Sequence, residues 1–379
     1  MSATAPDAEQ TRLAYSGRLM PDRQLLMFRN QGWAFAQRRI ARGASVRSLP
    51  LAASQLEDVA IISGGAQHDL FDYVSRNRVA GLLILHRGQV IQEHYEFGND
   101  AHTPWISMSI AKSISTTLLG AALRDGLIRS LDDQLTRYLP VLKSTGYDGV
   151  TLRQLLQMTS GLSWNETHSR ASTERRNMLE LQIAQRPGCV LDYLTSRPRI
   201  AEPGTEWVYG TGDAHIVGVL LRAVTGAWLS DYLAEKIWSR IGMEHDATWW
   251  LEAPDALEVA GSGINATLRD YARFGEFFRT GGIVDGASIL PENWLRDATS
   301  PRVIAGKRVD YGYMWWPVAG RDGSFTEGAF SARGIFGQYL YINPARELVI
   351  VSLSARAKPR FSEGILDNDF FNSVADALR

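Results

Sequence analysis

The chain has 379 residues, of which 45% are hydrophobic and 21% charged, as in a globular protein large enough for two lobes. Its 40 Lys and Arg residues balance 41 Asp and Glu residues, so no net field favours nucleic acid or a membrane surface as a partner. The single cysteine, Cys189, cannot form an internal disulfide. The N-terminal stretch lacks the apolar core of a signal peptide, and no run is long enough to span a bilayer, so we expect a cytoplasmic protein.

The first predicted elements are an arm and a hairpin. Residues 1–55 are rich in arginine and weakly periodic, and we interpret them as an N-terminal arm packed over a domain surface. The stretch AGLLILHRGQVIQEHYEF (80–97) predicts two strands joined at Arg87-Gly88. Towards the C-terminus, GQYLYINPARELVIVSLS (337–354) predicts a second hairpin with its turn at 343–347.

The pattern between the two hairpins is helical. Capping residues followed three positions later by an acidic or amide residue predict helix starts at Ser130, Thr151 and Thr267. Glycines mark the predicted ends of three helices: residues 213–225 (Gly226), 231–241 (Gly242) and 267–280 (Gly281). Residues 362–379 predict a C-terminal helix.

These elements predict an α+β fold. The two hairpin regions join most economically into one central antiparallel sheet flanked by helices, and the middle of the chain then forms a mostly helical second lobe. We expect a sheet domain made of residues 56–115 and 255–379 and a helical domain of residues 116–254. A cleft between two lobes is a common place for a site.

The segment WISMSIAKSISTTLLGAAL (105–123) predicts a buried helix with Lys112 near its start. The helix dipole repels an ammonium there, and desolvation also works against the charge, so the lysine needs a reason. Ser109, three positions earlier, shares its helical face. At the helix start the backbone N–H of Ser109 can point at an oxyanion, while a lysine with a depressed pKa can exchange protons with the hydroxyl or hold an anion.

Other chemistry is not signalled by the sequence. It contains no G-x-S-x-G elbow, H-E-x-x-H helix, G-x-x-x-x-G-K-[ST] loop or paired-cysteine spacing, and its seven histidines are scattered. S-x-x-K alone is a weak pattern, so the alternatives stay open that Ser109 is a small residue of a core helix and Tyr209 a loop tyrosine. We expect no metal and no organic cofactor.

Several stretches in order resemble a known family. They are SMSIAKS around Ser109, LLQMTSGLSWNE (155–166), EPGTEWVYGTGDAHIVGVLL (202–221), INATLRDYARFGEFF (264–278), YGYMWWP (311–317) and GIFGQYLYINP (334–344). Together they are similar to the serine β-lactamase and penicillin-binding-protein superfamily, in its branch of class C-like hydrolases and family VIII esterases. Within that branch the resemblance is greatest to the 6-aminohexanoate-dimer hydrolases. It implies the β-lactamase/transpeptidase-like fold.

The resemblance also implies roles for individual residues. Ser109 would be the acylated nucleophile, Lys112 its cationic partner, and Tyr209 the general base and then the acid that protonates the leaving group. A free phenol has a pKa of about 10, and an adjacent ammonium would lower it by stabilising the phenolate. The oxyanion hole would be formed by the backbone N–H groups of Ser109 and Ile335.

The sequence departs from the superfamily pattern at two elements. The usual Y-x-N reads Tyr209-Gly210-Thr211, so the amide that positions a β-lactam side chain is missing. The usual K-T-G aligns with Ala332-Arg333-Gly334, so the lysine that receives the substrate carboxylate is lost, and Arg333 could replace it or point to solvent. An S-D-N triplet is also absent. These departures weaken an antibiotic or cell-wall substrate.

The leading hypothesis is a serine hydrolase that cleaves small-molecule esters or amides through an acyl-enzyme. Substrate contacts are expected from the side chains Trp164, His168, Trp316 and Phe336, and the polar, aperiodic loop 162–178 is expected to act as a lid. His168 stands where the amide-cleaving relatives carry a lid tyrosine. The alternatives are a weak class C-like β-lactamase and a catalytically idle ligand-binding relative, and a homodimer is left open.

Overall fold

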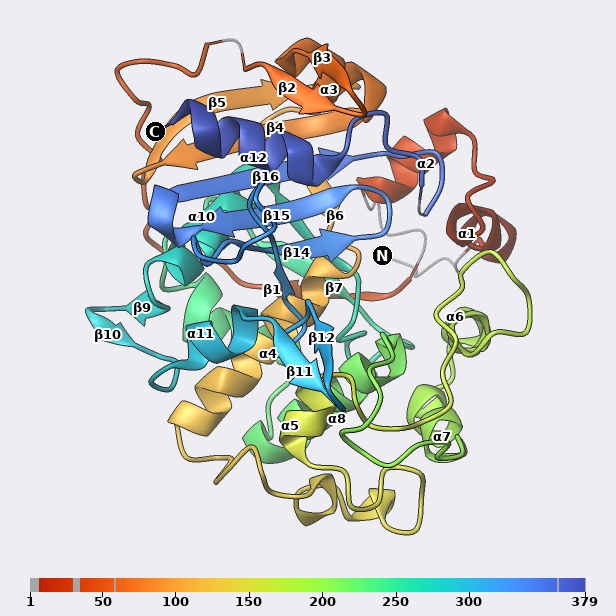
Figure 1. The fold of residues 1–379 in the computed structure, drawn as a ribbon. Helices are drawn as coiled ribbons and strands as arrows, with labels where there is room; N and C mark the ends of the chain where they lie inside the picture. The colour runs from red at the N-terminus through yellow and green to blue at the C-terminus, as the bar shows by residue number, and fades with distance from the viewer. Residues whose placement is uncertain (1–6, 30–34, 58, 360, 379) are drawn as a thin grey trace.

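The computed structural model describes residues 7–29, 35–57, 59–359 and 361–378, and its main feature is a six-stranded antiparallel sheet (Figure 1). The order of its strands is β13-β14-β15-β16-β4-β5. The strands are β4 (Val79–His86), β5 (Gln89–Tyr95), β13 (Trp316–Pro317), β14 (Phe330–Gly334), β15 (Gln338–Asn343) and β16 (Leu348–Ser354).

A second, four-stranded sheet has the order β1-β7-β8-β6, and three short hairpins decorate the surface. The strands of the second sheet are β1 (Gln37–Ile40), β6 (Pro104–Ile106), β7 (Ala247–Trp250) and β8 (Ile264–Thr267). The hairpins are β2 (Ile61–Ser63) with β3 (Ala66–His68), β9 (Ile283–Val284) with β10 (Ala287–Ser288), and β11 (Arg302–Ile304) with β12 (Lys307–Val309).

Helices surround both sheets. The α-helices before residue 110 and after residue 239 are α1 (Ala8–Tyr15), α2 (Pro21–Phe28), α3 (Leu70–Arg76), α10 (Leu268–Arg279), α11 (Trp294–Thr299) and α12 (Asp367–Ala377). Those that begin between residues 110 and 229 are α4 (Ile110–Arg124), α5 (Leu152–Leu156), α6 (Glu174–Ala184), α7 (Cys189–Thr195), α8 (Thr211–Thr225) and α9 (Leu229–Leu233). A π-helical turn (Ala234–Trp238) extends α9, and short 3-10 turns lie at Leu135–Arg137, Pro140–Leu142 and Pro344–Arg346.

Both predicted hairpins are confirmed, and they join as expected. β4 and β5 meet at Arg87-Gly88, where both residues have positive φ, and β15 and β16 are connected through 344–347. β16 pairs antiparallel with β4, with Ile350 opposite Ile84. The strands from the two ends of the chain therefore form one sheet, which lies under α12 in Figure 1.

Both faces of this sheet are buried, because successive side chains of a strand point to opposite sides. On β4, Leu82 and Ile84 belong to the core that includes Phe371 of α12. Leu83 and Leu85 belong to the larger core, which includes residues of α10. The two helix layers therefore cover opposite faces, and the predicted α+β architecture is confirmed.

The N-terminal arm contributes regular structure that its weak periodicity did not predict. β1 pairs antiparallel with β7, with Arg38 opposite Trp249. α1 reaches the rim of the helical lobe, where Arg12 forms an ion pair with Glu180 of α6. α2 packs the ring of Phe28 against Trp105 at 5.7 Å. The arm therefore contacts α6 and β6, the strand that leads into α4.

Several predicted helix boundaries hold, and others differ from the structure. Thr151 forms a capping box with Gln154 at the start of α5, Thr267 caps α10, and α8 ends at Gly226. The predicted helix start at Ser130 is wrong, because its hydroxyl accepts a hydrogen bond from the N–H of Asp132 in a tight turn. The helix predicted for 231–241 begins at Leu229 and ends with the π turn at Trp238.

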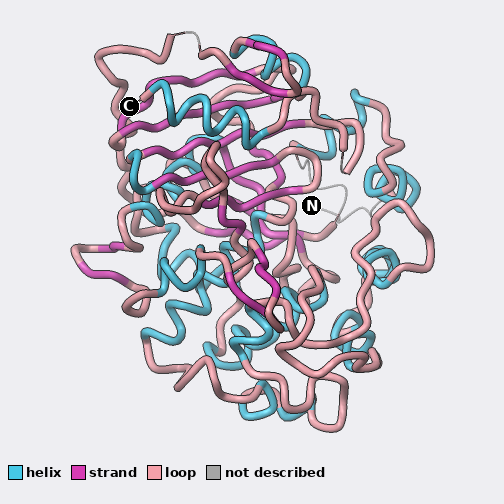
Figure 2. Tube along the Cα trace, viewed as in Figure 1, coloured by secondary structure: helices cyan, strands magenta, loops and turns pink. Residues whose placement is uncertain are grey.

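Long connections make up much of the helical lobe, as the loop colour in the lower half of Figure 2 shows. Among the described residues, no single helix has the length and apolar character needed to cross a membrane. By length and composition alone, one bent pair, Thr211–Thr225 with Leu229–Trp238 at 76°, passes that test together.

Candidate active site

The turn before α4 holds Ser109 at the mouth of a buried helix. β6 ends at Ile106, and Met108 takes a left-handed backbone with φ 45°, which bulky residues adopt only where the surroundings impose it. Ser107 fixes this turn: its N–H donates to Ile264 O at 2.7 Å, and its hydroxyl donates to Met108 O at 2.9 Å. Ser109 then occupies the N-cap of α4, as the sequence predicted.

Lys112 lies one turn further along α4 and touches the nucleophile candidate. Its Nζ lies 2.7 Å from Ser109 Oγ and 3.1 Å from the carbonyl oxygen of Gly261. The residue is 1% exposed. Burial lowers the pKa of Lys112 to about 7, against the attraction of the Glu166 carboxylate, and the nearby Arg175 lowers the pKa further. A lysine in this state can exchange a proton with Ser109 near neutral pH.

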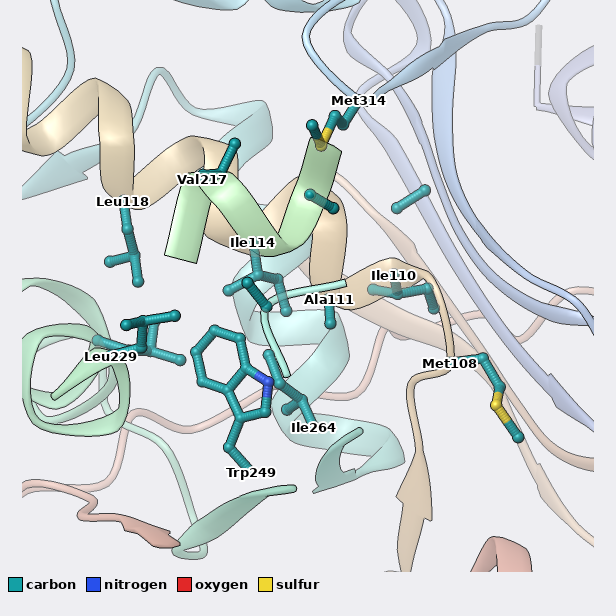
Figure 3. Packing of buried hydrophobic residues seen from close by; sticks show 14 of the residues in the cluster. Met108, Ile110, Ala111, Ile114, Leu118, Val217, Leu229, Trp249, Ile264 and Met314 are labelled. Atoms are coloured by element: carbon teal, nitrogen blue, oxygen red, sulfur yellow. The ribbon is translucent and has the colours of Figure 1, made fainter. Parts of the chain in front are cut away.

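The rest of α4 is packed on all sides, which keeps the pair in place. Figure 3 shows Ile114 and Leu118 of α4 beside Val217, Leu229 and Trp249. Three buried hydroxyl groups of α4 donate to carbonyl oxygens outside the helix, at distances of 2.7 to 2.9 Å: Ser113 to Met314, Ser115 to Ala260 and Thr116 to Tyr313. The helix is therefore anchored both by apolar packing and by hydrogen bonds to three loop positions.

Tyr209 comes from the segment before α8 and faces the same point. The N–H groups of its neighbours are held by one residue: Val208 N donates to Met158 O at 3.0 Å, and Gly210 N lies 3.3 Å from Met158 Sδ. Lys112 Nζ lies 5.1 Å from the centroid of the Tyr209 ring. The structure therefore brings Ser109, Lys112 and Tyr209 together from two elements about 100 residues apart.

The end of β14 lies against the turn that carries Ser109. A Cβ atom on Gly334 would lie 2.9 Å from the Cβ of Met108, so the strand end rests directly against the turn that carries Ser109. Ile335 follows Gly334. Within the described parts of the chain, neither the N–H of Ser109 nor that of Ile335 has a hydrogen-bond acceptor. Two such donors beside a nucleophile can bind a developing oxyanion.

A cleft of about 450 Å³ opens at this strand end. Its lining includes Tyr209, Ile335 and Trp316, and its outer wall includes Lys358, Pro359 and residues 361–363. Arg333 also lines it, with its guanidinium 5.3 Å from the Trp316 ring centroid. In the described chain its hydrogen-bond partners are neutral oxygens, Ser331 Oγ at 2.8 Å and Asn368 Oδ1 at 3.5 Å. Trp316 therefore lies at the edge of a cleft, beside an arginine that has no carboxylate within salt-bridge distance among the described residues.

Three other residues predicted to contact substrate lie elsewhere. Phe336 is 0% exposed and packs 5.2 Å from Phe28, so its side chain belongs to the core and that expectation is corrected. His168 is 6% exposed, with its ring stacked 6.0 Å from Tyr15. Trp164 is half-buried against the start of α8, and its Nε1 donates to Glu166 Oε2 at 2.6 Å. These side chains support the wall behind the site.

Glu166 and Thr211 are functional candidates that sequence reasoning missed. Thr211, the residue in place of the usual asparagine, donates both its hydroxyl and its N–H to the carboxylate of Glu166. Its side chain is therefore engaged behind the site and is not available to orient a substrate. Glu166 ends a family-like stretch, but nothing in the local sequence distinguishes a buried acid in a polar loop from an exposed one. Among the residues described, no group of three or more His, Cys, Asp or Glu side chains could hold a metal ion.

Comparison with known proteins agrees with this geometry. The family model described as Beta-lactamase matches residues 70–369, a range that contains Ser109, Lys112, Tyr209 and Ile335. The chain belongs to the β-lactamase family. The resemblance inferred from the ordered sequence stretches is thereby confirmed.

Three similar proteins match most of the length of this chain. The 6-aminohexanoate-dimer hydrolase of Paenarthrobacter ureafaciens is 26% identical over 306 residues, covering 77% of this chain and 76% of the relative. A Bacillus anthracis protein named as a candidate 6-aminohexanoate-dimer hydrolase superposes with a TM-score of 0.84 at 24% identity, covering 99% of this chain and 98% of its own. A family VIII carboxylesterase superposes with a TM-score of 0.61 at 19% identity, covering 81% of this chain and 94% of the esterase. The two structural likenesses show the shared fold.

Proposed function

We propose that this β-lactamase-family protein is a serine hydrolase that cleaves small esters or linear amides through an acyl-enzyme on Ser109. The observation that carries the proposal is the 2.7 Å contact between Ser109 Oγ and Lys112 Nζ inside a water-excluded helix start. A lysine there is unfavourable for folding, because burial and the helix dipole both oppose its charge. Proton exchange with a nucleophile gives a reason for keeping it.

The reaction would proceed in two halves. Ser109 Oγ attacks the substrate carbonyl carbon while its proton passes to the Lys112–Tyr209 pair, and the carbonyl oxygen becomes an oxyanion between the N–H groups of Ser109 and Ile335. The intermediate collapses as Tyr209 protonates the leaving oxygen or nitrogen, which departs as an alcohol or amine. Water then attacks the acyl-enzyme and releases the acid, with the same groups acting in reverse.

The surroundings of the site favour esters over linear amides and β-lactams. Amide cleavage requires a well-placed acid for the leaving nitrogen, and His168, at the lid position of the amide-cleaving relatives, is packed against Tyr15. A β-lactam would need side-chain and carboxylate contacts, and Thr211 is engaged with Glu166. The names of two similar proteins, a 6-aminohexanoate-dimer hydrolase and a family VIII carboxylesterase, support hydrolysis of esters or amides without ranking the two.

The direct test is covalent labelling with a fluorophosphonate probe, followed by peptide mapping. We expect one labelled site, Ser109, in the wild type, and neither label nor turnover of p-nitrophenyl butyrate in Ser109→Ala. Ser75→Ala is the matched control, because Ser75 is an exposed serine of α3 whose hydroxyl donates to Asp72 O. Wild-type esterase activity in Ser109→Ala would refute the nucleophile, and an unlabelled, inactive wild type would favour the ligand-binding alternative. A cytoplasmic location remains part of this proposal, since the reaction needs no disulfide or export.

A further inference from the structure

Glu166 is a buried carboxylate that none of the roles above uses. It lies in the loop before α6, 9% exposed. Its Oε2 accepts hydrogen bonds from Thr211 N at 3.0 Å and from Trp164 Nε1 at 2.6 Å, and its Oε1 accepts one from the Thr211 hydroxyl. These donors leave the carboxylate tightly fixed at the first residue of the 15-residue helix α8.

Two basic side chains, His168 and Arg175, accompany this carboxylate. His168 Nε2 lies 3.7 Å and Arg175 Nε 3.9 Å from Glu166 Oε1. Burial alone would raise the pKa of Glu166, but the charges of Lys112, His168 and Arg175, together with the Thr211 hydroxyl, outweigh it and lower the pKa. Glu166 is therefore ionised at neutral pH.

The carboxylate is connected to the catalytic lysine through Thr211 and Gly261. A Cβ on Gly261 would lie 3.1 Å from Thr211 Cγ2 and 3.5 Å from Lys112 Cε, so Thr211 and the lysine chain pack on the same glycine. Lys112 Nζ also donates to the carbonyl oxygen of Gly261. Thr211 is only two residues after Tyr209. A shift of Thr211 would therefore move both the tyrosine segment and the wall behind Lys112.

We propose that Glu166 is a positioning residue of this active site, which fixes Tyr209 through Thr211 and supplies the buried negative charge that faces Lys112. The inference rests on the proposed function, because it assigns Glu166 to the same Ser109–Lys112–Tyr209 chemistry. Loss of the charge would make both Lys112 and Tyr209 easier to deprotonate, since a nearby anion favours the protonated form of each. Loss of the hydrogen bonds would instead slow the reaction without moving its pH dependence.

Other titratable groups surround the pair and must be considered in any pH measurement. Those facing Lys112, Tyr209 or Glu166 from neighbouring elements are Ser109, His168, Arg175 and Tyr311, and Tyr311 in turn faces Asp213. Arg175 is the informative one, because its charge acts on Lys112 with the opposite sign to that of Glu166. Asp213 is held by the hydroxyls of Tyr147 and Ser160, and burial raises its pKa to about 7. Asp213 is present in every variant compared.

The experiment compares pH profiles of kcat/KM for p-nitrophenyl butyrate in wild type and four variants. Glu166→Gln removes the charge, Glu166→Asp keeps it but shortens the side chain, and Arg175→Met removes the opposing cation. Glu174→Gln is the matched control, because Glu174 accepts a hydrogen bond from Asn165 N in the same loop at 3.0 Å without touching α8. Fluorophosphonate labelling and circular dichroism establish that each protein is folded and that Ser109 reacts.

The two parts of the proposal give different results. We expect the rising limb of kcat/KM to move down by about one pH unit in Glu166→Gln and to move up in Arg175→Met. Glu166→Asp should keep the limb of the wild type but lose about tenfold or more of the plateau rate, because the tyrosine segment is displaced. Glu174→Gln should match the wild type in both respects.

Each contrary result has one meaning. A Glu166→Gln limb that stays in place or rises overturns the charge role, and a Glu166→Asp plateau equal to that of wild type overturns the positioning role. If Glu166→Gln does not fold, the direction of the Arg175→Met shift decides the charge role. A wild type that is neither labelled nor active refutes the proposed function itself, whereas a labelled wild type with unshifted variants refutes only this inference.

Discussion

Lys112 Nζ contacts Ser109 Oγ at 2.7 Å, and its second hydrogen bond goes to the carbonyl oxygen of Gly261. Among the described residues no carboxylate oxygen lies within 4.0 Å of the ammonium, so its charge is stabilised only from a greater distance. This more distant negative charge offsets part of the effect of burial, which explains why the pKa of Lys112 falls to about 7 and no further.

The pH dependence of the reaction follows from this pKa. Because burial lowers the pKa of Lys112 to about 7, the pair it forms with Tyr209 should lose its first proton near neutral pH. The deprotonated pair accepts the Ser109 proton, so kcat/KM should rise with pH through an apparent pKa close to 7. Initial rates from pH 5 to 10 measure the profile. A rise in kcat/KM centred at the pKa of a free phenol, about 10, would contradict the coupling of Tyr209 to Lys112.

Removal of the Tyr209 hydroxyl should abolish most of the activity. Tyr209→Phe keeps the ring that packs 5.6 Å from Trp316 but removes the group that transfers the proton to the leaving atom. General acid–base groups contribute about 100- to 10,000-fold, so we expect a loss of kcat in that range with little change in melting temperature. Tyr193→Phe, outside the site, serves as control. A Tyr209→Phe enzyme within a few-fold of wild type would eliminate Tyr209 as the acid–base group.

A methyl group at Gly334 should damage catalysis through the backbone. The added Cβ would lie 2.9 Å from Met108 Cβ and 2.5 Å from Gln338 Oε1, so the strand end would have to move away from the nucleophile turn. Displacement of the Ile335 N–H should reduce kcat by about 100-fold or more. Gly320→Ala is the control, because the nearest atom to its Cβ is the movable carboxylate of exposed Asp322. Equal kcat in Gly334→Ala and Gly320→Ala would exclude a role for this strand end.

The substrate ranking can be measured on one preparation. We expect kcat/KM to be highest for short-chain p-nitrophenyl esters, lower for linear amides such as the 6-aminohexanoate dimer, and lowest for penicillins. The reason is the leaving group: an ester oxygen departs with little help, whereas an amide nitrogen must be protonated by a well-placed acid. Amide turnover equal to or above ester turnover would reverse the ranking and identify an amidase.

Arg333 should favour substrates that carry a negative charge. Its guanidinium lines the cleft with only neutral oxygens as partners in the described chain, so an anionic substituent would gain a charge-assisted hydrogen bond. Arg333→Met should raise KM about tenfold for the p-nitrophenyl monoester of glutarate and leave that of p-nitrophenyl butyrate unchanged. Arg308→Met is the control, because Arg308 already pairs with Asp310 at 3.0 Å. Equal effects on the two esters would exclude an anion contact at Arg333.

Features that depend on residues close together in the chain could be predicted from the sequence. The two extended runs around Arg87-Gly88 predict β4 and β5, and the capping box at Thr151 predicts the start of α5. The spacing of Ser109 and Lys112 places both on one face at the start of α4, because residues three apart on a helix are neighbours. Each of these features is decided by turn chemistry or helical periodicity within a few residues.

The residues that meet at the site from distant parts of the chain can be identified only in the folded structure. Three contacts join segments dozens to hundreds of residues apart. Gly334 lies against Met108, Phe336 packs against Phe28, and Glu166 accepts a hydrogen bond from Thr211. Local patterns cannot specify such contacts, because an apolar or acidic residue has the same neighbours in sequence whether its side chain faces a cleft, the core or solvent. The packing of α8 and β14 against α4 makes that choice, since it fixes which side chains lose contact with water.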